Sequence, residues 1–111
     1  MTSTPNNDWL ILENLEQLLK DRQAADPDTS YVAQLYKKGD KKIAQKVGEE
    51  AVEVAIAAAS DNNQDIISES ADLLFHLMIL LQSRGLSLSS VKAELARREG
   101  LSGLIEKAHR K

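Results

Sequence analysis

Residues 41–60 read KKIAQKVGEEAVEVAIAAAS, and residues 64–84 read QDIISESADLLFHLMILLQSR. Apolar residues in both segments recur at helical spacing, and each segment is long enough for about five helical turns. The turn residues Asp61, Asn62 and Asn63 separate the two segments. Because so short a connection makes successive helices antiparallel neighbours, the sequence predicts a helical hairpin.

Shorter helices are expected on both sides of this hairpin, because cap and stop residues punctuate the chain. Asp40 and Asn63 are the candidate caps of the two long helices, and the second helix begins at Thr29 or Ser30. We also expect a last turn or two over residues 102–111. The sequence therefore predicts one all-α domain over residues 1–111, a small antiparallel bundle of about five helices. Their expected ranges are 8–25, 29–39, 40–60, 63–84 and 87–100.

The composition excludes several classes of protein. The absence of cysteine excludes disulfides, thiolate zinc sites and a cysteine nucleophile. A net charge of −3 argues against a general nucleic-acid binder. Uninterrupted apolar runs such as Leu77 to Leu81 are far shorter than the ~20 residues that a membrane span requires. We therefore expect a cytoplasmic protein with no nucleic-acid or membrane partner.

The two long helices carry apolar residues around most of their circumference. A helix that is apolar on nearly every side must be buried, and a few short helices cannot cover two of them. The sequence therefore predicts a homodimer in which a second chain completes the core.

Acidic residues interrupt the apolar stretches of both long helices. Glu53 is the only polar residue between Ala51 and Ala59, and Asp72 lies in a similarly apolar segment. We expect both acids to be buried, where an ionised carboxylate costs on the order of several kcal/mol unless something neutralises it. Each has a second acid three residues away on the same helix face, since Glu50 precedes Glu53 and Glu69 precedes Asp72.

Lysines accompany these acids. Lys42, Lys46, Glu49 and Glu53 lie along one line of the first long helix, with Glu50 beside it. Two facing helices would bring at least four carboxylates together, which must be protonated, paired with basic residues or bound to cations. Carboxylates without cysteine suit hard ions such as Mg²⁺ or Mn²⁺, which also bind substrate phosphates. The pattern therefore predicts a magnesium–polyphosphate site.

Some of these residues also have a simpler interpretation. Glu49 fits a solvated helix face as well as it fits a site, and Lys42 and Lys46 fit surface partners of neighbouring acids. His76 fits a ligand or a base, but a histidine on an apolar helix is more often a hydrogen-bonded core residue. We interpret His76 as such a core residue.

The spacing of the acids resembles that of a known superfamily. Fifteen residues separate two pairs that read Glu50-x-x-Glu53 and Glu69-x-x-Asp72, as in the all-α, MazG-like nucleoside triphosphate pyrophosphohydrolases. A more specific pattern resembles the phosphoribosyl-ATP pyrophosphohydrolase family over about residues 9–111. This pattern consists of Ser30-Tyr31, Lys46-Val47-Gly48-Glu49-Glu50 and Ala71-Asp72-Leu73-Leu74-Phe75-His76.

The resemblance implies a Mg²⁺-dependent cytoplasmic dimer that hydrolyses a small-molecule nucleotide, phosphoribosyl-ATP, in the second step of histidine biosynthesis. It implies that a metal-bound water attacks phosphorus and that pyrophosphate leaves. Some members are fused to a cysteine-containing cyclohydrolase, so a chain without cysteine is expected to be a stand-alone enzyme. The implied metal ligands are Glu50, Glu53, Glu69 and Asp72, the implied catalytic residues are Glu49, Glu50 and Glu53, and the expected phosphate-binding residues are Lys38, Lys42 and Lys46.

Two other functions remain open at this stage. A pyrophosphatase that removes dUTP, dCTP or damaged nucleotides would use the same acids, so only the substrate distinguishes it. A non-catalytic helical module whose acids bind a basic partner predicts neither metal dependence nor pyrophosphate release.

Overall fold

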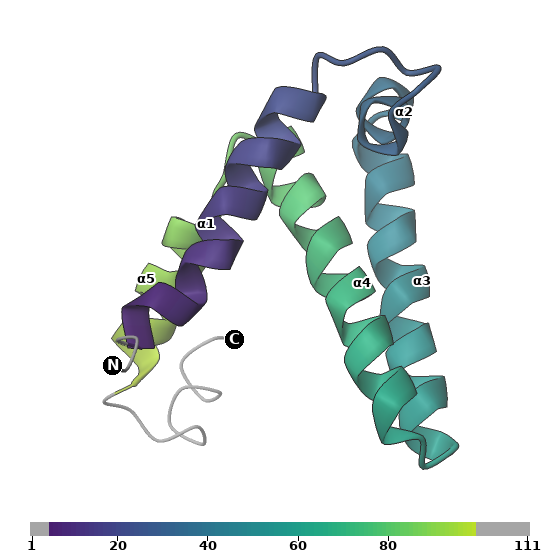
Figure 1. The fold of residues 1–111 in the computed structure, drawn as a ribbon, viewed down its shortest axis with the longest axis vertical. Helices are drawn as coiled ribbons and strands as arrows, with labels where there is room; N and C mark the ends of the chain where they lie inside the picture. The colour runs from purple at the N-terminus through teal and green to yellow at the C-terminus, as the bar shows by residue number, and fades with distance from the viewer. Residues whose placement is uncertain (1–4, 100–111) are drawn as a thin grey trace, which may run out of the picture.

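A computed structural model describes residues 5–99, which form five α-helices and no strand (Figure 1). The all-α prediction is therefore confirmed for this part of the chain, and the turns expected over residues 102–111 lie outside it. The helices are α1 (Pro5–Arg22), α2 (Tyr31–Lys38), α3 (Asp40–Ala59), α4 (Asn63–Ser83) and α5 (Leu88–Arg98).

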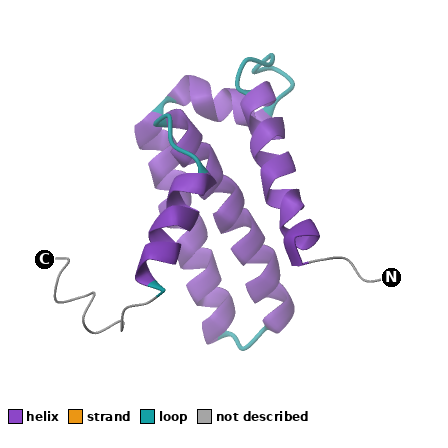
Figure 2. Ribbon diagram, turned by 90° about the vertical axis from the view of Figure 1, so that its left-hand side faces the viewer, coloured by secondary structure: helices purple, strands orange, loops and turns teal. Residues whose placement is uncertain are grey.

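The predicted hairpin is the main element of the fold. Helices α3 and α4 run antiparallel and lie side by side along their whole length (Figures 1 and 2). Helix α1 crosses only the end of this hairpin where α4 finishes (Figure 1), and α5 follows α4 there, with its Leu88 amide bonded to the Glu16 side chain of α1. The far end of the hairpin, next to the α3–α4 turn, therefore projects away from the other helices.

Helix α2 does not run antiparallel to its neighbours as the sequence analysis expected. It lies across the end of the hairpin (Figure 2), because a single residue, Gly39, connects it to α3. Gly39 has a φ of 95° and a ψ of 172°, a conformation that is accessible almost only to glycine. The other end of α2 follows the longer connection over residues 23–30, where the Ser30 side chain accepts a hydrogen bond from the Ala33 amide.

The buried core lies where α1, α2, α3 and α4 meet. Ile43 of α3 and Ile79 of α4 are both 0% exposed, and Leu19 of α1 is 1% exposed. The remaining members of this cluster come from α2 and α4, and they are Val32, Leu35 and Met78. These side chains hold α2 and the start of α3 against the second half of α4.

The helix ends differ from the prediction by a few residues. Helix α4 is capped by Asn62 rather than Asn63, because the Asn62 side chain accepts a hydrogen bond from the Asp65 amide at 3.0 Å. Asp40 is the first residue of α3 rather than its cap, and its carboxylate pairs with Arg84 at 3.1 Å. Helix α1 is shifted toward the N-terminus, since it begins at Pro5 rather than at residue 8.

The far part of the hairpin leaves apolar side chains exposed. Val52 is 56% exposed, Ile56 52% and Ile67 64%. Glu53 and Asp72 are exposed as well, so the expectation that these two acids are buried is wrong for the single chain. For Glu53 the reason is that its apolar neighbours Val52 and Ile56 are themselves left exposed by the helices of the same chain.

Helix α4 is, among the described residues, the one helix long and apolar enough to cross a membrane, with a mean hydropathy of 1.3. The apolar run Leu77 to Leu81, which the sequence analysis used against a membrane span, is only one part of this apolar helix. However, α4 carries Asp65, Glu69 and Asp72, and acids within a bilayer are costly. Since α3 also packs along it, we interpret α4 as a helix of the hairpin and not as a membrane span.

Candidate metal centre

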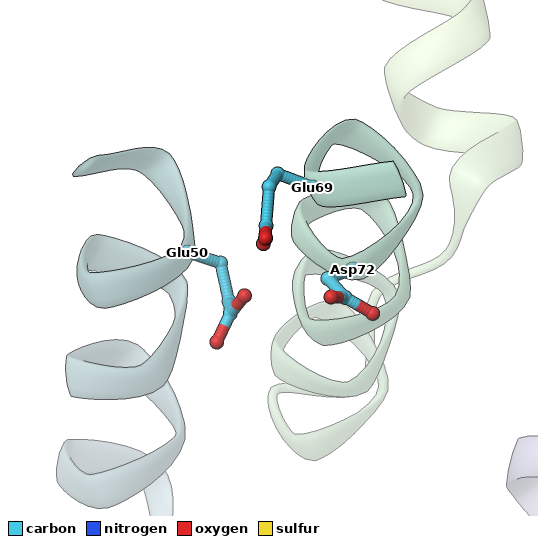
Figure 3. A group of neighbouring side chains, drawn as sticks. All are labelled: Glu50, Glu69 and Asp72. Atoms are coloured by element: carbon cyan, nitrogen blue, oxygen red, sulfur yellow. The ribbon is translucent and has the colours of Figure 1, made fainter. Parts of the chain in front are cut away.

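Three carboxylates from the two hairpin helices meet between α3 and α4. Oxygen atoms of Glu50, Glu69 and Asp72 all lie within 4.8 Å of one another (Figure 3). Glu69 and Asp72 lie on one face of α4 because they are three residues apart, and Glu50 points at them from α3. Glu50 and Glu69 are half-buried and Asp72 is exposed, so the group opens to solvent on one side.

The pKa of Glu69 reports the crowding of negative charge in this cluster. Desolvation raises this pKa first, and the charges of Asp72, Glu53, Glu50 and Asp65 raise it further. These charges come from both helices, so the repulsion is a property of the assembled hairpin. A cation bound between the helices would relieve it.

Lys46 is the basic residue closest to this cluster on α3. Its ammonium nitrogen lies 3.5 Å from Glu49 Oε1 and 3.5 Å from Glu50 Oε2. Desolvation lowers the pKa of Lys46, but the neighbouring Tyr31 and the bonds to Glu49 and Glu50 outweigh it, so the pKa is raised. Lys46 is therefore firmly protonated and offsets part of the charge of Glu50.

Glu49 lies at the solvent side of Lys46. A hydrogen bond from the Gln45 amide to Glu49 Oε2, at 2.9 Å, is the main cause that lowers the pKa of Glu49. Desolvation opposes this shift, while Lys46 and Lys42 support it. An exposed carboxylate with a low pKa stays ionised, so Glu49 is suited to orienting a water molecule more than to accepting its proton.

The other candidate residues lie at the edge of the cluster or outside it. Glu53 lies one turn after Glu50 on α3 and outside the group of three, although its charge contributes to the raised pKa of Glu69. Lys42 lies one turn before Lys46 and its charge reaches Glu49. Lys38 is exposed in the last turn of α2, and within residues 5–99 it makes no ion pair with these acids.

Tyr31 and His76 form a polar contact beside the cluster that the sequence analysis missed. The Tyr31 hydroxyl lies 2.8 Å from His76 Nε2, and His76 Nδ1 lies 2.8 Å from the main-chain oxygen of Asp72. Since His76 is only 6% exposed, its interpretation as a hydrogen-bonded core residue is confirmed. Burial raises the pKa of Tyr31, Lys46 lowers it, and the charges of three acids of the site raise it further.

A cavity of about 380 Å³ lies elsewhere, between α1 and the start of the α4–α5 connection. Its lining includes Glu16 of α1 and Gln82 of α4, and it contains none of the acids of the metal centre. The candidate metal centre therefore lies outside this cavity, on the open face of the hairpin.

The sequence matches one family model and many related proteins. The model described as phosphoribosyl-ATP pyrophosphohydrolase matches residues 12–99. The chain is 58% identical over 99 residues to the phosphoribosyl-ATP pyrophosphatase of Erythrobacter litoralis, covering 89% of this chain and 95% of that protein. It is 52% identical over 90 residues to the histidine biosynthesis bifunctional protein HisIE of Escherichia coli, covering 81% of this chain and 44% of that protein. All the acids and lysines of the candidate centre lie within the residues that the family model matches.

Proposed function

Because this chain belongs to the phosphoribosyl-ATP pyrophosphohydrolase family, we propose that its hairpin hydrolyses phosphoribosyl-ATP to phosphoribosyl-AMP and pyrophosphate. The chain is thus a hydrolase of histidine biosynthesis. The main support for the proposed site is that oxygen atoms of Glu50, Glu69 and Asp72, from two helices, lie within 4.8 Å of one another.

The donor set of this site fits a divalent cation such as Mg²⁺, with Mn²⁺ as a substitute. Glu50, Glu69 and Asp72 offer hard oxygen ligands, and their mutual repulsion is shown by the raised pKa of Glu69. Glu53, one turn further along α3, is the fourth ligand in this proposal. A cation held by these residues would neutralise phosphate oxygens and make a water molecule more acidic.

The lysines of α3 are suited to holding the polyphosphate against this site. Lys46 is protonated and lies within 3.5 Å of Glu50, so its ammonium group is already at the edge of the acids. Lys42 follows the same helix face one turn away, and Lys38, in the last turn of α2, is the third phosphate-binding residue in this proposal. In the reaction, a water oxygen bonds to phosphorus as the α–β anhydride bond breaks, and Glu49 orients that water. Pyrophosphate leaves with the electrons of the broken bond and takes up the proton that the water loses.

We also propose that the chain forms a homodimer in the cytoplasm. The exposed Val52, Ile56 and Ile67 lie on the projecting part of the hairpin, and such apolar side chains are more stable when a second copy covers them.

The test is pyrophosphate release from phosphoribosyl-ATP and from a panel of dNTPs, each with Mg²⁺ and with EDTA. We expect metal-dependent release from phosphoribosyl-ATP. Turnover of a dNTP instead would indicate a house-cleaning pyrophosphatase, and no release from any substrate would favour the non-catalytic module. Asp65→Asn provides a matched control for Asp72→Asn, since Asp65 lies on the same helix outside the group of three. We expect only Asp72→Asn to abolish turnover.

A further inference from the structure

A chain of hydrogen bonds connects α2 to the metal centre, and the proposed reaction does not by itself explain it. The chain runs from the Tyr31 hydroxyl through the His76 ring to the main-chain oxygen of Asp72, and both bonds are 2.8 Å long. The two rings meet edge to face, with an interplanar angle of 83°. The first residue of α2 is thereby tied to the turn of α4 that carries a candidate metal ligand.

The direction of each proton in this chain follows from the chemistry of its groups. A main-chain oxygen only accepts hydrogen bonds, so His76 Nδ1 carries the hydrogen. In the neutral imidazole Nε2 is then an acceptor, and the Tyr31 hydroxyl donates to it.

The position of Tyr31 is fixed at both ends of the residue. Its main chain begins α2 directly after Ser30, which is 5% exposed and caps the helix through a 3.2 Å bond from the Ala33 amide. Its hydroxyl is held by His76. Tyr31 itself is nevertheless 46% exposed, so the residue adds little to the hydrophobic core.

We propose that Tyr31 and His76 are positioning residues for the metal centre, which hold the Asp72 turn of α4 at the position that a divalent cation requires. This inference rests on the proposed function. The alternative is that the Tyr31 hydroxyl merely satisfies the buried Nε2 of His76. That bond would then stabilise the fold and have no effect on metal affinity.

The first test is Mn²⁺ affinity, measured by electron paramagnetic resonance on the full chain carrying Tyr31→Phe. We expect affinity to fall about tenfold, the order found when groups that orient metal ligands are removed. Tyr36→Phe is the matched control, because Tyr36 also lies on α2 and donates to Gln82 of α4 at 2.7 Å, outside the acidic cluster. We expect Tyr36→Phe to bind Mn²⁺ like the wild type.

The double variant Tyr31→Phe/His76→Leu separates positioning from stability. Replacing both partners by apolar groups removes the unpaired Nε2, so resistance to urea should recover relative to Tyr31→Phe. Mn²⁺ affinity should stay low. Recovery of Mn²⁺ affinity together with stability, or wild-type affinity in Tyr31→Phe, would overturn the inference and leave the proposed function standing. Failure of the wild type to bind Mn²⁺ would overturn both.

Discussion

Two isoleucines on α4 provide a quantitative test of the proposed dimer. Ile79 is 0% exposed and belongs to the core cluster, whereas Ile67 is 64% exposed on the projecting part of the hairpin. Both residues lie within the same helix, so substitution by alanine changes the same chemistry and the same helix propensity. The difference between the two effects therefore measures burial.

The expected losses in free energy follow from the exposed fractions of the two side chains. Ile79→Ala should lower the free energy of unfolding by about 2–5 kcal/mol, as large-to-small changes in a core do. Burying a whole isoleucine contributes about 1.5–3 kcal/mol, so the third of Ile67 that the single chain buries contributes roughly 0.5–1 kcal/mol. If a second copy covers the remainder, Ile67→Ala loses about 1–2 kcal/mol more in each subunit. That loss raises the dissociation constant of the dimer about 30- to 1,000-fold.

Sedimentation equilibrium of wild type and both variants measures this dissociation constant, and urea unfolding at two protein concentrations measures stability. We expect Ile67→Ala to weaken dimerisation and Ile79→Ala to weaken the fold at every concentration. A monomeric wild type, or an Ile67→Ala variant that dimerises like the wild type, would refute the assignment of this face to a second copy.

Three further outcomes test the site and the fold. Asp72→Asn should reduce turnover at least about 1,000-fold. The circular dichroism spectrum in EDTA should stay unchanged, because Asp72 is exposed and part of a repulsive cluster. Unfolding of the variant without metal would show that Asp72 stabilises the fold and would contradict this prediction. Gly39→Ala should lower the free energy of unfolding by about 1–3 kcal/mol, because Gly39 has a φ of +95° that alanine rarely adopts. Gly48→Ala, in the middle of α3, should raise the free energy of unfolding by about 0.5–1 kcal/mol. Urea unfolding measures both. Hydrogen bonds from two arginines lower the pKa of Glu94 from 4.5 to about 2. The contribution of Glu94 to stability is therefore complete above pH 4.5 and is lost as the pH falls toward 2. An NMR titration midpoint near 4.5 would contradict this.

The helices and the facing of the acids could be predicted because both depend on local periodicity. Main-chain hydrogen bonds four residues apart set the helical repeat, which places Glu69 and Asp72 on one face whatever surrounds them. The short turn at Asp61 then forces α4 back along α3, so Glu50 meets that face. These two facts predicted that at least four carboxylates meet, and the structure brings three of them, Glu50, Glu69 and Asp72, together.

The burial of side chains and the contacts between distant residues depend on the tertiary structure, so the helical pattern of the sequence could not predict them. Glu53 shares the apolar neighbours that predicted its burial, yet it is exposed, because burial depends on whether another element covers those neighbours. Tyr31 and His76 are 45 residues apart, and no periodicity relates them. They meet because Gly39 turns α2 across the hairpin, so the contact depends on one backbone conformation and on the packing of the core around Ile43. The sequence alone determined which faces of the helices carry the chemistry, and only the packing of the helices determined which of those residues touch.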